Sequence, residues 1–289
     1  MTNLCLQIIE NSAKIPSFSS FEERIHSYLI GLVRDKIDIR FKVVDERNLI
    51  FYLPGKLPDL VVLTAHLDKI NHFGEEFPQE LPFWMNETEI CGQLDNTVGI
   101  GITMATLIES IGKNRPSIMV LLSEMEESYG LKYHPQLLRN GGNGLNHGMG
   151  ALRLCKWMKK QQISPDAIIT IDTTPLFKGE PGVALYSKHW EFTKTVPSEA
   201  EIKATEDLVR MFTTINPNLK LANNTNDYLH YGAEMNRNAK TPIPSIAIEP
   251  AIFPYHTKNE KVFIKDILEV KQLVATFLDS YAQQEDQNR

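Results

Sequence analysis

Short apolar runs along this chain are separated by longer segments whose apolar residues have helical spacing. The runs LVVLTA, SIMVLLS and AIITI are typical of buried strands, because they are short, continuous and rich in aliphatic residues. Upstream, IDIRFKVV and NLIFYL are followed by Pro54 and Gly55, and they predict a hairpin that leads into the strand ending at Ala65. The segment PIPSIAIEP predicts a late strand.

Two helices are predicted to open the chain. Leu4, Ile8 and Ile9 give the first helix one apolar face. Ser20 followed by Glu23 is the signature of a capping box, and it predicts the start of the second helix before IHSYLIGLV.

A buried helix is predicted from Asn96 to Gly112, where apolar residues recur throughout the segment. Gly99 and Gly101 near its start allow close packing, at a helix-propensity cost of about 1 kcal/mol each. Asp95 stands directly before this helix. Capping of the helix is therefore one interpretation of Asp95, and the metal-binding role argued below is compatible with it.

Further helices are predicted in ALRLCKWMKK, from Ser198 with Glu201 as a second capping box, and in ILEVKQLVATFLDSYA. This alternation of strands and helices predicts an α/β fold, a three-layer α/β/α sandwich with a mostly parallel central sheet. Because the chain has no internal repeat or low-complexity linker, residues 1–289 are expected to form a single domain.

Two segments interrupt the alternation. Residues 69–94 are a polar, proline-containing excursion that is expected to carry two short strands and to form one wall of a pocket. Within residues 130–150, five glycines and three asparagines crowd positions 139–150, a composition that excludes regular structure. This loop is interpreted either as a substrate lid or as a solvated insertion.

Composition narrows the class of partner. The chain has 289 residues, a formal net charge of −6 and no Lys/Arg-rich stretch, which argues against a nucleic-acid groove or an anionic membrane surface as partner. Cys5, Cys91 and Cys155 lack CxxC spacing and predict neither a disulfide framework nor a thiolate zinc site. Without a signal-peptide pattern or a run of 18 apolar residues, a cytoplasmic protein with a small substrate is expected.

Candidate metal ligands and a general base occur in a fixed order along the chain. Each short motif is weak evidence alone. However, several of these residues follow predicted buried strands, and in an open α/β sheet ligands bind beyond the carboxyl ends of the strands. The set therefore predicts a two-metal hydrolase. It comprises His66 and Asp68 in AHLD, Asp95 in LDNTVG, Glu126 and Glu127 in EMEESYG, Asp172 in TIDTT and His256 in YHTKNE.

The stretches VVLTAHLD, CGQLDNTVG, EESYG, IDTT and HTKNEKVFIKD resemble, in this order, the dinuclear zinc exopeptidase superfamily. That superfamily includes leucyl aminopeptidases, glutamyl aminopeptidases and carboxypeptidase G-like enzymes. TIDTTPLFKGEPG and HTKNE favour the glutamyl branch, whereas LDNTVG fits the leucyl branch equally well. The interval between Asp172 and His256 hardly leaves room for the inserted dimerisation domain of the carboxypeptidase G-like branch, so a single catalytic domain is expected.

The resemblance implies a role for each residue. Asp95 would bridge two zinc ions. His66 and Asp172 would complete one site, and Glu127 and His256 the other; Co²⁺ or Mn²⁺ could replace zinc. Asp68, two residues beyond His66, would hold the imidazole in its metal-binding tautomer.

Catalysis would then use a water that the two metals share. Two metals about 3.5 to 4 Å apart lower the pKa of that water and stabilise the tetrahedral oxyanion. Glu126 would act as the general base and return the proton to the leaving amine, and Glu124 is the alternative base. His147, Asp227 and Tyr255 are candidates for substrate contacts.

The expected function is an aminopeptidase acting on short peptides. A carboxypeptidase or an N-acyl amino acid deacylase would use the same metals with a different pocket. A catalytically silent peptide-binding relative is the alternative from another class. The interval between His66 and Asp95 is too short for an extra assembly domain, so a monomer or homodimer is expected.

Overall fold

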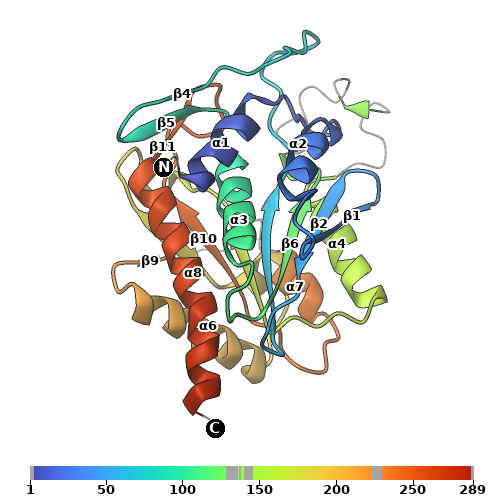
Figure 1. Ribbon diagram of the computed structural model, residues 1–289, viewed down its shortest axis with the longest axis vertical. Helices are drawn as coiled ribbons and strands as arrows, with labels where there is room; N and C mark the ends of the chain where they lie inside the picture. Colours follow the sequence, from blue (N-terminus) through green and yellow to red (C-terminus); the bar gives the residue numbers. More distant parts are fainter. Residues whose placement is uncertain (1–2, 128–135, 137, 140–145, 223–229, 288–289) are drawn as a thin grey trace.

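An eight-stranded sheet forms the centre of the computed structural model, with helices on both of its faces (Figure 1). The structure describes residues 3–127, 136, 138–139, 146–222 and 230–287. The strand order is β1-β2-β6-β3-β7-β10-β8-β9. The strands of this sheet are β1 (Arg40–Val44), β2 (Asn48–Leu53), β3 (Leu60–His66), β6 (Ser117–Ser123), β7 (Ala167–Ile171), β8 (Val183–Tyr186), β9 (Lys220–Leu221) and β10 (Ser245–Pro250).

The interior of the sheet is parallel. β3 pairs in parallel with β6 on one side and with β7 on the other, and β7 pairs in parallel with β10. The antiparallel pairings lie nearer the edges, where β2 joins β1 and β6, and β8 joins β10. The predicted hairpin, which is β1 and β2, and the mostly parallel central sheet are confirmed.

Helices cover both faces of the sheet. One face packs against α1, α2, α3, α6 and α8, and the other against α4 and α7. This arrangement confirms the predicted three-layer α/β/α sandwich. The helical elements are α1 (Leu4–Lys14), α2 (Glu23–Val33), α3 (Thr97–Glu109), α4 (Met149–Lys160), the 3₁₀ turn η4 (Pro175–Phe177), α5 (His189–Thr193), α6 (Glu199–Ile215), α7 (His230–Asn236) and α8 (Ile264–Gln287). In the described part of the chain, none of these is both long and apolar enough to cross a bilayer.

The side chains of β3 show how one apolar run supplies both faces. Val61, Leu63 and Ala65 are buried on the side of α1, α3 and α8, whereas Val62 is buried on the side of α4. Successive side chains of a strand point to opposite faces, so a strand covered on both faces is apolar throughout. This burial explains why the strand has no polar alternation in the sequence.

Helix α3 lies against the sheet with little room around its first turn. A Cβ atom on Gly99 would lie 2.4 Å from the carbonyl oxygen of Ile171, and one on Gly101 would lie 2.3 Å from the side chain of Ile9. The predicted close packing at both glycines is therefore confirmed. The helix is capped by Asn96, whose side chain accepts a hydrogen bond from the backbone N–H of Gly99. The interpretation of Asp95 as the capping residue was therefore wrong.

The first of the two predicted capping boxes is also wrong. α2 begins at Glu23, and the Ser20 hydroxyl instead accepts a hydrogen bond from the backbone N–H of Arg139. The Ser198 side chain does accept from the backbone N–H of Glu201, so the second N-cap is confirmed. The Ser20 hydroxyl contacts the distant Arg139 instead of the helix, and the local sequence does not predict that contact.

The excursion at residues 69–94 carries the two expected short strands, β4 (Trp84–Met85) and β5 (Glu89–Gly92). A third strand, β11 (Glu260–Phe263), pairs antiparallel with β5 and completes a small second sheet. The sequence did not predict this pairing, because its partners lie far apart along the chain. It brings the region after His256 next to the region before Asp95.

Lys69, the first residue of the excursion, is buried, and its Nζ donates to the carbonyls of Ser12 and Ile15 and to the hydroxyl of Ser17. Burial lowers the pKa of Lys69 to about 7, although Asp68 opposes this shift. Between pH 7 and the ordinary lysine pKa, the unfolded chain holds a proton that the folded chain has lost. The free energy of unfolding therefore gains a contribution that rises with pH in this window.

Relative to the variant Lys69→Met, the wild type is expected to gain about 1.4 kcal/mol in free energy of unfolding per pH unit from pH 7 to pH 9. Urea unfolding at several pH values measures this difference, and effects common to both proteins cancel. Lys160→Met, at an exposed position on α4, is the control and should show no such slope. Parallel curves for wild type and Lys69→Met would contradict the assignment.

Candidate metal centre

Four of the predicted site residues lie at or shortly after the ends of three neighbouring strands. His66 is the last residue of β3, Asp172 directly follows β7, and Glu126 and Glu127 come shortly after β6. These strands lie in the order β6-β3-β7, and all run parallel. Their carboxyl ends therefore meet at one edge of the sheet, which is where ligands collect in open α/β sheets.

Asp95 and His256 come from outside the central sheet. Asp95 lies between β5 and α3, and its peptide bond to Asn96 is cis. His256 lies between β10 and β11. Because β5 and β11 are paired strands of the small sheet, the two side chains arrive together at the same edge of the central sheet.

The five predicted metal ligands form two groups that share Asp95. In the first group, His66 Nε2 lies 3.0 Å from Asp95 Oδ1 and 3.7 Å from Asp172 Oδ1. In the second, His256 Nε2 lies 3.7 Å from Asp95 Oδ2 and 3.5 Å from Glu127 Oε1. The ligand atoms of each group lie within 4.8 Å of one another. One carboxylate thus presents a separate oxygen to each group.

Glu126 lies beside both groups. Its Oε2 is 3.8 Å from His66 Nε2, and its ligand atom also groups with those of His66 and Glu127. Its neighbour Glu127 belongs to the same group and in addition lies 3.5 Å from His256 Nε2 through its Oε1.

Asp68 holds the loop that carries these two acids. Its Oδ1 accepts the backbone N–H of Glu126 at 2.9 Å, and its Oδ2 accepts that of Glu127 at 2.8 Å. The Ser19 hydroxyl also donates to Oδ2. His66 Nδ1 lies 3.0 Å from the backbone oxygen of Asp68 and 3.4 Å from its carboxylate. Both contacts favour the tautomer with a proton on Nδ1, in which the unprotonated Nε2 can act as a metal ligand.

The buried carboxylates repel one another. Burial and the nearby Asp95 raise the pKa of Glu127 and that of Asp172 well above their usual values. Burial would lower the pKa of His66, but Asp172, Asp68 and Asp95 outweigh it and raise that pKa well above the usual range. Each shift has the sign expected where negative charge is concentrated and water is excluded.

This excess of negative charge tests whether the residues fit metal ions. Asp95, Glu126, Glu127 and Asp172 are buried close to the buried imidazole of His66 and the partly exposed imidazole of His256. Buried charges need a partner, and divalent cations supply it. Carboxylate oxygens and imidazole nitrogens are ligands that suit zinc. The residues therefore fit a pair of divalent metal ions.

Glu260 is a site residue that the sequence reasoning missed. Its buried carboxylate accepts the backbone N–H of Leu94 at 2.7 Å and that of Asp95 at 3.1 Å through Oε2, and that of Thr257 at 3.2 Å through Oε1. One side chain thus joins the segments that carry Asp95 and His256. The residue lies in the motif HTKNE, but only the β5–β11 pairing reveals its role.

A second buried network, formed by Glu22, Arg47 and Glu124, also supports the loop. Arg47 Nε lies 2.8 Å from Glu124 Oε2 and 3.0 Å from Glu22 Oε2. Glu22 Oε1 accepts the backbone N–H of Met125, and Arg153 pairs with Glu124. Glu124, the alternative base, is thus held by two arginines and belongs to neither metal group.

The three candidates for substrate contacts have different positions. His147 Nδ1 contacts the backbone oxygen of Glu126, and its Nε2 lies 3.9 Å from Glu126 Oε1. The ring of Tyr255 stacks on that of His256 with 3.7 Å between centroids. Asp227 and most of the glycine-rich segment 130–150 lie outside the described residues.

The comparisons with known proteins found solved structures of similar fold. No protein-family profile matches the chain, and no curated protein sequence matches it. The TET1 peptidase of Pyrococcus horikoshii, which can assemble into a tetrahedron or a large octahedral shell, superimposes with a TM-score of 0.64 at 13 % identity, covering 95 % of this chain and 99 % of that chain. An aminopeptidase from Desulfurococcus kamchatkensis gives 0.65 at 13 % identity, with coverages of 96 % and 94 %.

A third solved structure carries a different name. An endoglucanase from Thermotoga maritima superimposes with a TM-score of 0.60 at 10 % identity, covering 93 % of this chain and 96 % of that chain. At such identities a likeness establishes the fold, whereas activity must be argued from the site. The chain has the fold of these peptidases over nearly its whole length.

Proposed function

We propose that this protein is a two-zinc exopeptidase, acting as an aminopeptidase on short peptides. The observation that carries the proposal is the pair of ligand groups that share Asp95. The names of the TET1 peptidase and the Desulfurococcus aminopeptidase, which have the same fold, support the peptide as substrate class. Co²⁺ or Mn²⁺ could replace zinc, because they accept the same nitrogen and oxygen ligands.

The proposed reaction divides the work among the residues already described. Bound zinc ions would activate a water and stabilise negative charge on the attacked carbonyl oxygen. Asp95, His66, Asp172, Glu127 and His256 would hold the ions. Glu126 would take the proton of the water on its carboxylate and release it to the leaving amine. Asp68 keeps Glu126 in place through the backbone N–H that it accepts.

Tyr255 and His147 lie where a substrate would meet the protein. Tyr255 stacks on His256 at the rim of the centre, and His147 lies beside Glu126. We propose that they contact the peptide next to the scissile bond. The surplus of carboxylates at the centre would favour the ammonium end of a peptide, although bound metal neutralises part of that charge.

Matched peptides test the reaction class. Peptides with free and with acetylated N-termini are incubated with zinc-loaded protein, with and without chelator. Zinc-dependent release of the first residue from free N-termini only is the expected result. Release of acetate, or trimming from the carboxyl end, would instead indicate the deacylase or the carboxypeptidase. Metal-bound protein that leaves every peptide intact would indicate the silent peptide-binding relative.

Endoglucanase activity has no comparable support in the site. Most glycosidases place two carboxyl groups on either side of a sugar bond and need no metal for the reaction. Here four buried carboxylates gather around the buried His66 and the partly exposed His256. That donor set favours metal-dependent hydrolysis.

Removing the Glu260 carboxylate should weaken metal binding. Glu260→Ala leaves the backbone N–H groups of Leu94 and Asp95 without their acceptor, so the shared ligand Asp95 loses its support. Zinc affinity is expected to fall about 10-fold to 100-fold, the usual cost of losing a group that orients a ligand. Competition with a chelating dye measures it.

Glu89→Ala is the matched control. It lies on the same small sheet and pairs with the exposed Lys261. Zinc affinity equal to wild type is expected for Glu89→Ala, and the same result for Glu260→Ala would contradict the positioning role.

The segment before Asp95 and the three cysteines bear on assembly and location. The segment between His66 and Asp95 contains β4 and β5 and has no room for an extra assembly domain. A monomer or homodimer is therefore proposed, in contrast to the shells that the TET1 peptidase can form. Light scattering coupled to size-exclusion chromatography measures the mass. The cysteines are buried and unpaired, which supports a reducing compartment such as the cytoplasm.

A further inference from the structure

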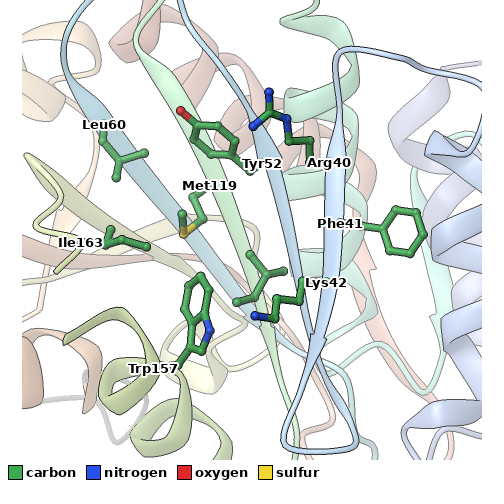
Figure 2. Close-up of a pocket in the computed structure, with 9 residues that line it drawn as sticks. Arg40, Phe41, Lys42, Tyr52, Leu60, Met119, Trp157 and Ile163 are labelled. Carbon is green, nitrogen blue, oxygen red and sulfur yellow. The ribbon is translucent and has the colours of Figure 1, made fainter. Parts of the chain in front are cut away.

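A pocket of about 350 Å³ opens on the side of the sheet where α4 packs (Figure 2). Its apolar floor includes Ile50, Leu60 and Met119 from three strands, with Ile163 from the segment after α4. Leu60 is the first residue of β3, whereas the metal-ligand candidate His66 is the last. The pocket and the candidate metal centre are therefore separate sites.

Two cationic side chains stand at the rim of this pocket. Arg40 and Lys42 alternate along β1, the edge strand, and so point to the same face, while Phe41 points away from the pocket (Figure 2). The Lys42 Nζ lies 5.5 Å from the ring centroid of Trp157. In the described parts of the chain, no carboxylate forms an ion pair with Arg40 or Lys42.

Another lysine–tryptophan pair in the same protein shows the contrast. Lys261 Nζ lies 5.3 Å from the ring of Trp84 and also pairs with Glu89 at 2.9 Å. Lys42 likewise lies over a tryptophan ring, but among the described residues no carboxylate pairs with it as Glu89 pairs with Lys261.

Trp157 adds a hydrogen-bond donor at this place. Its Nε1 is buried, and the described residues supply no acceptor for it. In Figure 2 the nitrogen side of the indole faces Lys42. A buried donor without an acceptor is costly, at about 1 to 3 kcal/mol, and such a group calls for an explanation.

We propose that this pocket binds a small apolar carboxylate. The carboxylate pairs with Lys42 and accepts a hydrogen bond from Trp157 Nε1, while Arg40 adds positive charge on the same face of β1 and the hydrocarbon part lies on Met119 and its apolar neighbours. An apolar floor with a few convergent polar groups is the usual composition of a small-molecule site. The net charge of the chain is −6, so the two cations on this face have the sign opposite to that of the whole chain.

Octanoate and octan-1-ol test the proposal by calorimetric titration of zinc-loaded protein. Octanoate is expected to bind once per chain, and octan-1-ol, which lacks the charge, to bind at least about tenfold more weakly. Lys42→Ala should weaken octanoate binding by about tenfold, and Trp157→Phe should weaken it while the ring is kept. Ile163→Trp fills the pocket and should abolish binding. Lys261→Ala is the matched control and should bind like wild type.

Four results would overturn the proposal. The first two are that wild type does not bind octanoate, or that it binds octan-1-ol as tightly as octanoate. The third is that Lys42→Ala and Ile163→Trp bind octanoate as tightly as wild type. The fourth is that, among the variants, Asp95→Ala alone loses octanoate binding. The last result would mean that the carboxylate binds the metal centre. Circular dichroism of each variant checks that it is folded.

Discussion

Glu126→Gln is expected to keep the metal ions and lose most of the turnover. Glutamine has the same shape, and the contacts that hold this position use the backbone N–H of residue 126, which Asp68 accepts at 2.9 Å. What disappears is the carboxylate that takes a proton. General-base catalysis contributes about 100-fold to 10,000-fold, so kcat should fall by that factor. Steady-state kinetics on a free dipeptide, together with metal analysis, measure both quantities.

Glu124→Gln is the comparison for this prediction. Glu124 is buried between Arg47 and Arg153, so its neutralisation should lower the free energy of unfolding and leave most of the turnover of the folded protein intact. An active Glu126→Gln protein, or a Glu124→Gln protein that is folded and inactive, would show that the base is assigned to the wrong residue.

Asp95→Ala is expected to empty both metal sites. Asp95 presents Oδ1 to the group of His66 and Oδ2 to the group of His256, so one substitution removes a ligand from each. Losing a group that only orients a ligand costs about 10-fold to 100-fold in metal affinity, and losing a shared ligand should cost more than about 100-fold at both sites. Zinc titration against a chelating dye measures the number and affinity of bound ions.

Asp172→Ala separates a shared ligand from an unshared one. Asp172 belongs to the group of His66 and Asp95 only. Its removal should therefore cost one ion and leave the other bound with nearly normal affinity. Two tightly bound zinc ions in Asp95→Ala would contradict the bridging role, and so would the loss of both ions in Asp172→Ala with one retained in Asp95→Ala.

The local sequence was enough to predict the site residues that lie at the ends of strands. The runs before His66 and Asp172 were recognised as strands, and three parallel neighbours must bring their carboxyl ends together. The resemblance then implied how Asp95 would be shared, and the structure brings the same five residues into two groups.

Features that rest on contacts between distant segments were not predicted. Glu260 reaches Asp95 only because β11 pairs with β5, and no period in the sequence encodes that pairing. Ser20 has a capping signature, yet Arg139 takes its hydroxyl. The pocket beside Trp157 likewise needs β1 and α4 to meet. In each case the role of a residue depends on a contact with a distant segment, and the sequence around that residue predicts either no role or a different one.

The central claim is that two metal ions bind on either side of Asp95. Anomalous diffraction at the zinc edge, from crystals of the zinc-loaded protein, tests it most directly. Two peaks about 3.5 to 4 Å apart are expected, one next to His66 and Asp172 and the other next to Glu127 and His256. A single peak, or peaks away from Asp95, would contradict the account.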